Sequence, residues 1–201
     1  AAIHLPGIRK IAIVDLIGEG RSGSQIATMI QSFLMGTEYY EILERDKLQR
    51  VLEEQNLTLS GVVDDATAAE VGKMLGVNAM IFGEVTLYEV EDIEKEKMVK
   101  EKVFSGRYRT VEKKDKKGKV KKVREKIYKE IMVPKKYWVR KGDVAINFRV
   151  VEVETGKLLA AHSDSRSYDS EKRRSFFSSS QKLKPRGEIL SDLSNAICKK
   201  F

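Results

Sequence analysis

The sequence predicts an α/β (α+β) fold: a mixed sheet of about five strands packed with helices, plus a long projecting basic β-hairpin. Two observations lead to it. Between residues 8 and 85, short apolar runs typical of strands alternate with segments of helical spacing, which favours a sheet covered by helices. Residues 94–141 then alternate with a period of two and hold 20 Lys and Arg against seven Asp and Glu. We expect a single domain over residues 1–201, with the hairpin extension inserted at 94–141.

The basic charge of the chain belongs to this one segment. The 201 residues carry a net charge of +8, whereas residues 94–141 alone carry +13, so the remainder sums to −5. A chain of this length can bury a proper core, and no apolar run reaches the ~18 residues of a transmembrane helix. The one cysteine, Cys198, excludes an internal disulfide, and we interpret it as a small apolar residue on the last helix.

The first expected strand covers residues 8–17, where β-branched side chains suit a pleated surface. A helix is expected over residues 25–35, begun by Ser22 or Ser24 as its N-cap and ended at Gly36. Its apolar residues recur at helical spacing and should face the core: Ile26, Met29, Ile30 and Phe33.

A second strand is expected over residues 39–43. Asp46 follows it and can cap a helix, because its carboxylate can accept a bond from a free N–H of the first turn. Apolar residues then recur at helical spacing until Gly61 breaks the pattern.

Asp64 or Asp65 can cap the next helix, and Gly76 stands where a left-handed C′ residue is expected. An apolar strand over residues 79–85 follows it. The helix should bury one face against the sheet: Ala68, Ala69, Val71, Met74 and Leu75.

The basic segment predicts a two-stranded hairpin over residues 97–109 and 120–133, with Gly118 at a turn position that allows a positive φ. Downstream, residues 143–153 and 158–167 predict paired strands joined by a tight turn with Gly156 at its left-handed position.

An amphipathic helix over residues 188–199 closes the chain. Its expected inward face consists of Ile189, Leu190, Leu193, Ala196 and Ile197.

Residues 18–23, GEGRSG, match the G-x-G-x-x-G pattern of dinucleotide-binding loops, and Glu44 lies where such a fold would hold a ribose. This gives one enzymatic alternative, a dinucleotide-binding enzyme that uses Gly18–Gly23. However, Glu19 within the loop would repel a phosphate, and two consecutive helices do not follow a βαβ order. We therefore favour a plain turn from strand to helix.

Side chains suited to catalysis or metal binding are sparse. The two histidines, His4 and His162, are far apart in sequence, and with one cysteine they give no zinc-ligand spacing. His162, Ser163 and Asp164 are neighbours on an expected strand, so they point to alternate faces and cannot form a triad. We predict no catalytic residue, no metal site, no cofactor and no small-molecule substrate.

Two stretches carry a family resemblance. The first contains ERDKLQRVLEEQ followed by LSGVVDDATAAEVGKMLGVNAMIFGEV, and the second, residues 144–169, reads VAINFRVVEVETGKLLAAHSDSRSYD. With these blocks in this order, the chain resembles the curli production assembly/transport lipoprotein (CsgG-like) family. The resemblance implies a non-enzymatic cell-envelope protein, an assembly or secretion component or scaffold at the periplasmic face of the outer membrane. It also implies an N-terminal lipid anchor that is not present in this chain.

Members of the family include oligomeric outer-membrane secretion pores and soluble activators of cell-wall synthases, and both functions stay open as alternatives. A pore strand needs ~9–11 residues with an unbroken apolar outer face. Here lysines occupy both faces of the expected hairpin, and a charge at the bilayer midplane costs ~2–4 kcal/mol. The sequence therefore favours a soluble, non-pore member.

The basic hairpin is the predicted contact surface. Its charge complements the acidic remainder, which favours another copy of the chain or another envelope protein as the partner. An anionic membrane surface is the second choice and nucleic acid the last. The residues predicted to make partner or oligomer contacts are Glu44, Arg45, Arg107, Tyr108, Arg109, Lys121, Lys122, Tyr137 and Trp138.

Overall fold

The structure, a computed structural model, describes residues 5–54, 65–114, 118–172 and 183–200, apart from the side chains of residues 45 and 46. It consists of two compact units. The first, here called the body, comprises Ala1–Glu91 and Arg140–Phe201. The second, here called the ribbon, comprises Asp92–Val139. Gly61 and Asp64 lie outside the described residues, as does His4.

The described strands form one mixed sheet of five strands in the order β2-β1-β3-β4-β5, which confirms the predicted fold class. β1 (Lys10–Ile13) pairs in parallel with both β2 (Glu41–Ile42) and β3 (Ala79–Lys114). β4 (Val120–Glu152) lies beside β3 and pairs antiparallel with β5 (Leu158–Asp169). In that last pairing Phe148 stands opposite His162.

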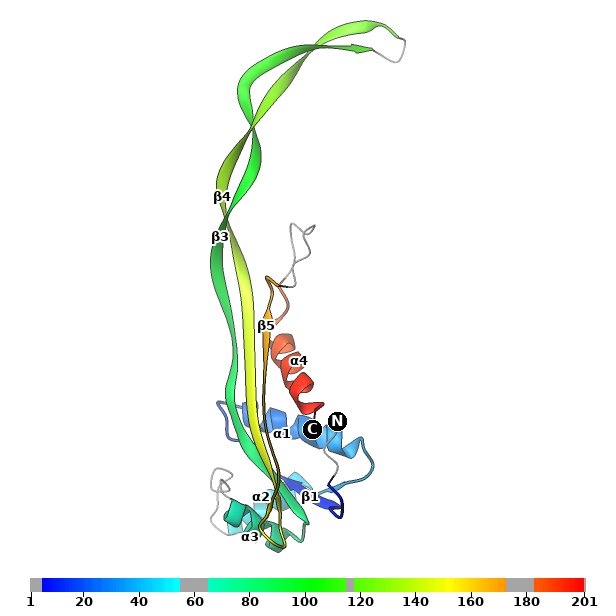
Figure 1. Ribbon diagram of the computed structural model, residues 1–201, viewed down its shortest axis with the longest axis vertical. Coiled ribbons are helices and arrows are strands. Elements are labelled where there is room, and N and C mark those ends of the chain that lie inside the picture. Colours follow the sequence, from blue (N-terminus) through cyan, green and yellow to red (C-terminus); the bar gives the residue numbers. More distant parts are fainter. Residues whose placement is uncertain (1–4, 55–64, 115–117, 173–182, 201) are drawn as a thin grey trace. The chain divides into compact units, whose positions relative to one another are not determined.

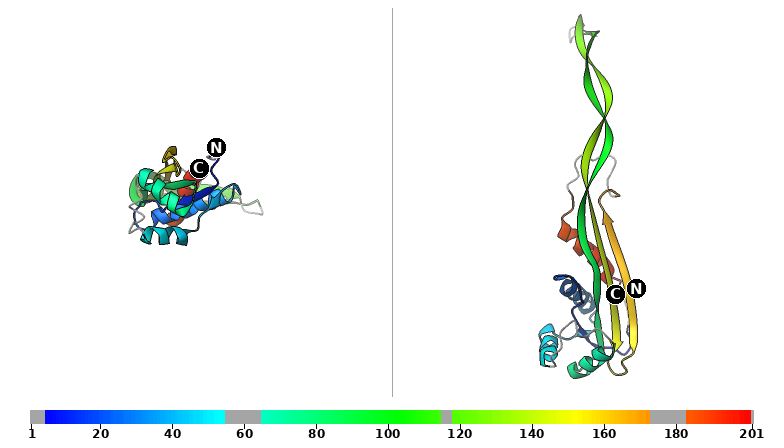
Figure 2. Two further views of the ribbon diagram at one scale, coloured as in Figure 1. Left: turned by 90° about the horizontal axis from the view of Figure 1, so that it is seen from below. Right: turned by 90° about the vertical axis from the view of Figure 1, so that its left-hand side faces the viewer.

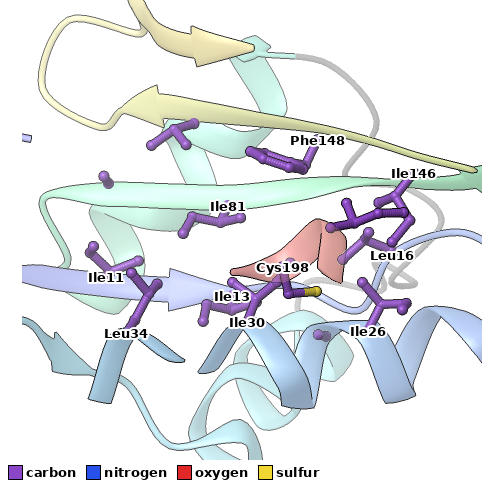
Figure 3. Close-up of a cluster of buried hydrophobic side chains, with 14 of the residues drawn as sticks. Ile11, Ile13, Leu16, Ile26, Ile30, Leu34, Ile81, Ile146, Phe148 and Cys198 are labelled. Atoms are coloured by element: carbon purple, nitrogen blue, oxygen red, sulfur yellow. The ribbon is translucent and has the colours of Figure 1, made fainter. Parts of the chain in front are cut away.

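Two helices cover one face of the sheet in the body: α1 (Ser22–Met35) and α4 (Arg186–Cys198) (Figure 1). Figure 3 shows apolar side chains of the sheet and of these helices gathered in one cluster. Ile11, Ile26 and Ile81 in this cluster are fully buried. Cys198 belongs to the same cluster, and burial raises the pKa of its thiol to about 11.

The opposite face of the sheet is covered by α2 (Arg45–Glu54) and α3 (Asp65–Leu75). Gly72 on α3 lies so close to the sheet that an added Cβ would stand 2.3 Å from a side-chain carbon of Val153. The helix can therefore approach the sheet only with glycine at this position. At the end of α3, Gly76 has a φ of +66°.

Several predicted details of the body are wrong. β1 is shorter than residues 8–17, because the chain leaves the regular ladder after Ile13 and returns to β3 only through an isolated bridge between Ile17 and Glu84. Ser22 and Ser24 lie inside α1 instead of capping it, and their hydroxyls donate to the carbonyls of residues 19 and 21.

Two further caps and faces differ from the prediction. Asp46 lies within α2, and the carbonyl of Glu44 accepts the bonds that begin that helix. Met74 is 52% exposed, because the buried stripe of α3 follows Ala68, Val71 and Gly72 at spacings of three and four. On α4, Ala196 is exposed while Ser194 is buried.

The ribbon consists of consecutive stretches of β3 and β4 that wind around each other (Figures 1 and 2). The predicted strands over residues 97–109 and 120–133 are too short, since β3 covers Ala79–Lys114 and β4 covers Val120–Glu152. Gly118, just before β4, has a φ of +77°. Among the described residues of the ribbon only Val139 is buried, so this unit has no enclosed core of its own.

Candidate contact surface on the ribbon

The ribbon carries more positive charge than the chain as a whole. It holds 18 Lys and Arg against eight Asp and Glu, a net of +10. Because the whole chain carries +8, the body carries −2. The body is thus closer to neutral than the −5 obtained with the predicted boundaries 94–141. Attraction between a ribbon and the body of another copy is correspondingly weaker.

Three aromatic side chains contact one another across the two strands of the ribbon. The ring centroids of Phe104 and Tyr108 are 5.2 Å apart, and those of Phe104 and Tyr128 are 6.4 Å apart, both edge to face. Gly106 lies between the first two and has a φ of +79°, so the strand departs from extended geometry there. This departure explains how residues four apart on a strand can touch.

Cations lie over the faces of the same rings. The Arg124 guanidinium carbon is 5.1 Å from the centroid of Tyr108, and Lys126 Nζ is 5.6 Å from that of Phe104. Such contacts contribute about 0.5–1 kcal/mol at exposed sites. The rings nevertheless remain 40% (Phe104), 48% (Tyr108) and 56% (Tyr128) exposed. The cluster therefore both holds the strands together and presents apolar surface to solvent.

Glu125 connects two cations of the facing strand. Its carboxylate accepts from Arg109 at 3.0 Å and from Lys113 at 2.7 Å. The hydrogen bond from Lys113, and then that from Arg109, lowers the pKa of the Glu125 carboxyl below its ordinary value. Two further cross-strand ion pairs, Lys136 with Glu94 and Lys100 with Glu130, are exposed and weak.

Seven of the nine predicted contact residues lie on the ribbon: Arg107, Tyr108, Arg109, Lys121, Lys122, Tyr137 and Trp138. Tyr108 and Arg109 take part in the clusters just described, and Tyr137 has Lys97 Nζ 5.3 Å from its ring centroid. Trp138 is 52% exposed. Arg107, Lys121 and Lys122 are also exposed.

The remaining two predicted contact residues, Glu44 and Arg45, lie in the body. Glu44 is exposed and its carbonyl begins α2, while Arg45 is the first residue of that helix. Their place in the structure is at the start of a helix, and their role in partner contact stays a prediction.

Sequence reasoning did not place Phe104, Tyr128, Arg124 or Glu125 among the contact residues. One signal in the sequence could have found the aromatic pair, because Phe104 and Tyr108 fall on the same face of an alternating strand with a glycine between them. Glu125 is also conspicuous as the one acid between residues 119 and 129.

The glycines of residues 18–23 are explained by packing. A Cβ added to Gly23 would stand 1.6 Å from the carbonyl oxygen of Leu16, so α1 can begin this close to the preceding loop only with glycine there. A Cβ on Gly18 would meet Ser22 Oγ at 2.5 Å, and Gly20 has a φ of +58°. Close packing at Gly18 and Gly23 and the positive φ at Gly20 give each glycine of the motif a structural reason.

His162, Ser163 and Asp164 are consecutive residues of β5, and the side chains of His162 and Asp164 have different contacts. The ring centroids of His162 and Phe148 are 5.4 Å apart. The Asp164 carboxylate instead accepts from Arg166 Nη2 at 3.2 Å and from Lys200 Nζ at 2.9 Å. The bond from Lys200 is the largest cause that lowers the pKa of the Asp164 carboxyl. Asp164 therefore serves as the centre of an ion-pair group between β5 and the end of α4.

A hollow of about 510 Å³ lies on the sheet of the body, with Glu84, Asn147 and Arg149 in its lining. Asn147 Nδ2 donates to Glu84 Oε1 at 3.0 Å, and Arg149 Nη1 lies 3.6 Å from Asp65 Oδ1 in an ion pair. Its charged groups are thus engaged with protein partners. Within the part of the chain that the structure describes, no group of three or more His, Cys, Asp or Glu side chains is arranged to hold a metal ion.

The family profile described as "Curli production assembly/transport component CsgG" matches residues 18–123, more than half of the chain. The chain belongs to the CsgG family. The match begins at the glycine loop, covers the helices α1 to α3 and extends through β3 into the ribbon. The second block of the resemblance, residues 144–169, lies beyond the matched stretch.

Three solved structures are similar to this CsgG-family chain. The lipoprotein GNA1162 from Neisseria meningitidis is 13% identical, with 95% of this chain and 99% of that chain covered and a TM-score of 0.48. The LpoB C-terminal domain from Salmonella enterica is 7% identical, with 80% of this chain and 86% of that chain covered and a TM-score of 0.43. The chain of a PelC dodecamer from Paraburkholderia phytofirmans is 11% identical, with 94% of this chain and 83% of that chain covered and a TM-score of 0.44.

No curated protein sequence matches the chain significantly. In the described ranges of the chain, no helix has both the length and the apolar character that crossing a membrane would require.

Proposed function

We propose that this CsgG-family chain is a non-enzymatic component of the bacterial cell envelope that takes part in assembly or secretion. The observation that carries the proposal is the family match over residues 18–123, whose description is an assembly and transport component. The match covers about half of the body and two thirds of the ribbon, where it includes Phe104 and Tyr108 but not Tyr128 or Trp138.

We place the protein at the periplasmic face of the outer membrane, anchored by an N-terminal lipid that is not part of residues 1–201. These residues act as one CsgG-like domain in which the ribbon is an inserted extension. The body supplies the folded scaffold, and the ribbon supplies the contacts with other envelope proteins or with other copies of the chain.

The chemistry of the ribbon supports a role in protein contact. Exposed tyrosine, tryptophan and arginine side chains are the residue types that dominate the binding energy of protein interfaces. Tyr108, Arg124 and Trp138 are of these types, and both aromatic side chains are about half exposed. Contiguous exposed apolar surface marks interaction sites, and the contacting rings of Phe104, Tyr108 and Tyr128 provide it.

The experiment is fractionation and affinity purification of the full-length protein from the bacterium that carries it. We expect the protein in the outer-membrane fraction together with a co-purifying partner. Trp138→Ala should reduce the recovered partner at least about 5-fold, since a hot-spot aromatic contributes about 1 kcal/mol or more. Met74→Ala is the matched control, because Met74 is also 52% exposed but lies in the body. Recovery in the cytosol, or an equal loss with both variants, would contradict the proposal.

A second function, activation of a cell-wall synthase, uses the same ribbon with a different kind of partner. The exposed aromatic cluster of Phe104, Tyr108 and Tyr128 favours it, since the body carries too little charge to hold a ribbon of another copy strongly. The two functions differ in solution mass. A self-associating scaffold gives oligomers in light scattering at low salt, whereas an activator remains a 22.8 kDa monomer and co-purifies with a synthase.

A further inference from the structure

The tip of the ribbon is a compact group of lysines, here called the lysine tip. Lys113 and Lys114 end β3, Lys119 directly precedes β4, and Lys121 and Lys122 lie at its start. All five are exposed. The described residues 112–114 and 118–122 contain one acid, Glu112, so this short stretch carries a net charge of +4.

The five charges act together on a ligand. Residues on one strand follow each other at about 3.3 Å, and paired strands lie about 4.8 Å apart. Several lysines of the tip therefore fall within one Debye length, which is about 10 Å at 0.1 M salt. A ligand with many negative charges at similar spacing would feel their sum.

Arginine and lysine differ in their contacts on the ribbon, although Lys113 of the tip also bonds Glu125, at 2.7 Å. Arg109 binds Glu125, and Arg124 lies over the ring of Tyr108, so these arginines serve directed contacts within the fold. The lysine tip contains no arginine. Because a guanidinium suits bidentate contact with protein carboxylates and an ammonium is a compact point charge, the tip is suited to summed attraction rather than to one directed protein partner.

The tip also lacks what a nucleic-acid groove provides. Proteins that bind single strands combine cations with aromatic side chains on which bases stack. No aromatic residue occurs between Tyr108 and Tyr128, whereas Val120 at the tip is 53% exposed. The cations at the tip and the aromatic cluster are thus separated along the ribbon.

We propose that the lysine tip binds a phosphate-bearing lipid surface by summed electrostatic attraction. The bound state is peripheral: the ammonium groups lie among the headgroup phosphates, and the strands do not enter the hydrocarbon. Clusters of about four to eight basic residues bind anionic membranes in this way, with about 1 kcal/mol, or about 5-fold in affinity, for each lysine. The biological setting of this inference rests on the proposed envelope function.

The test measures binding of the intact chain to sedimented vesicles. One set contains phosphatidylcholine alone and the other phosphatidylcholine with phosphatidylglycerol. The tip variant carries Lys→Gln at the five tip positions. The control variant removes five exposed lysines of the body instead: Lys47, Lys73, Lys157, Lys172 and Lys199. Both variants lose the same net charge, and circular dichroism checks that both are folded.

We expect the unchanged chain and the control variant to bind vesicles that contain phosphatidylglycerol and not those of phosphatidylcholine alone. The tip variant should bind at least about 100-fold more weakly, given about 5-fold per lysine. Raising the salt to about 1 M, where the Debye length is about 3 Å, should release the unchanged chain as well.

Three outcomes would overturn the inference. The unchanged chain could fail to bind anionic vesicles, or both variants could lose binding equally, which would make net charge alone responsible. In the third, the unchanged chain would bind a single-stranded oligonucleotide more tightly than anionic vesicles at equal phosphate concentration, and the tip variant would lose that tighter binding, which would favour nucleic acid as the ligand. The vesicle assay does not depend on where the protein resides in the cell. Vesicle binding can therefore fail while fractionation still finds the chain in the envelope. Vesicle binding can also succeed while fractionation finds the chain elsewhere.

Discussion

The body and the ribbon are stabilised by different interactions. In the body the sheet lies between two layers of helices, and side chains such as Ile11, Met80 and Ile81 are fully buried. In the ribbon the same strands β3 and β4 are held by cross-strand rings, cation–π contacts and exposed ion pairs. An enclosed core favours stability, whereas a two-stranded ribbon is only marginally stable by itself and leaves its side chains accessible to partners.

The largest expected difference comes from removing an isoleucine side chain in each unit. Ile81→Ala in the body should lower the free energy of unfolding by about 4 kcal/mol, because a fully buried side chain leaves a cavity. Ile127→Ala in the ribbon, where the side chain is 37% exposed, should cost less than about 1 kcal/mol. Urea denaturation followed by circular dichroism measures both. Equal costs would show that the ribbon is packed against something as tightly as the body.

Glycines in the two units should also respond differently. Gly23→Ala in the body forces a Cβ against the carbonyl of Leu16, so we expect a loss of about 3 kcal/mol or more. Gly106→Ala in the ribbon meets no atom within 4 Å, but the φ of +79° costs an L-residue about 1–2 kcal/mol.

Thermal denaturation of the two variants tests this pair, with Gly187→Ala as control. Gly187 has open space and an ordinary φ within α4, so alanine there should be neutral or stabilising. A tolerated Gly23→Ala would reopen the interpretation of residues 18–23 as a ligand loop.

The aromatic cluster should stabilise the ribbon alone. Phe104→Ala removes both ring contacts, each of which contributes about 0.5–1.5 kcal/mol, so local opening of the ribbon should become easier by about 2 kcal/mol. Amide hydrogen exchange should show this loss of protection in residues 98–114 and 120–132 and leave the core strands of the body unchanged. Loss of protection throughout the body would mean that the two units unfold together.

The smallest expected effect is a dependence of ribbon protection on pH through Glu125. Because its pKa is lowered in the folded state, the ion pairs with Lys113 and Arg109 stabilise the ribbon fully above the ordinary carboxyl pKa of about 4.3. The stabilisation is then lost as the pH falls through the lowered value. Hydrogen exchange of ribbon amides between about pH 6 and pH 3 should show this trend. In Glu125→Gln the trend should be reduced, and an unchanged trend would assign it to other carboxylates.

Much of the fold follows from local patterns in the sequence. The alternation of apolar strands and helical spacings predicted a mixed sheet with helices, and the structure confirms it. Details that depend on tertiary packing could not be predicted from the sequence in the same way. The exposure of Met74 depends on which face of α3 lies against the sheet, and that face is fixed by Gly72 against Val153, a contact between residues 81 positions apart.

The candidate contact surface could be predicted only in part. Charge and period identified the ribbon and, within it, Tyr108 and Arg109, since these properties are visible residue by residue. The ring cluster and the pairing of Glu125 depend on the register between two strands and on the backbone at Gly106, which the sequence alone does not determine. The strands are longer than predicted, since β3 runs to Lys114 and β4 extends from the ribbon to Glu152.

The most direct test of the account is to identify which unit touches the partner in the living cell. A photo-crosslinking amino acid is placed at Tyr128 or Trp138 on the ribbon, and at Met35 or Met74 on the body. All four side chains are between 52% and 57% exposed, so accessibility is matched. The account predicts crosslinked adducts from both ribbon positions and none from the two body positions. Adducts from Met35 or Met74, with none from the ribbon, would contradict it.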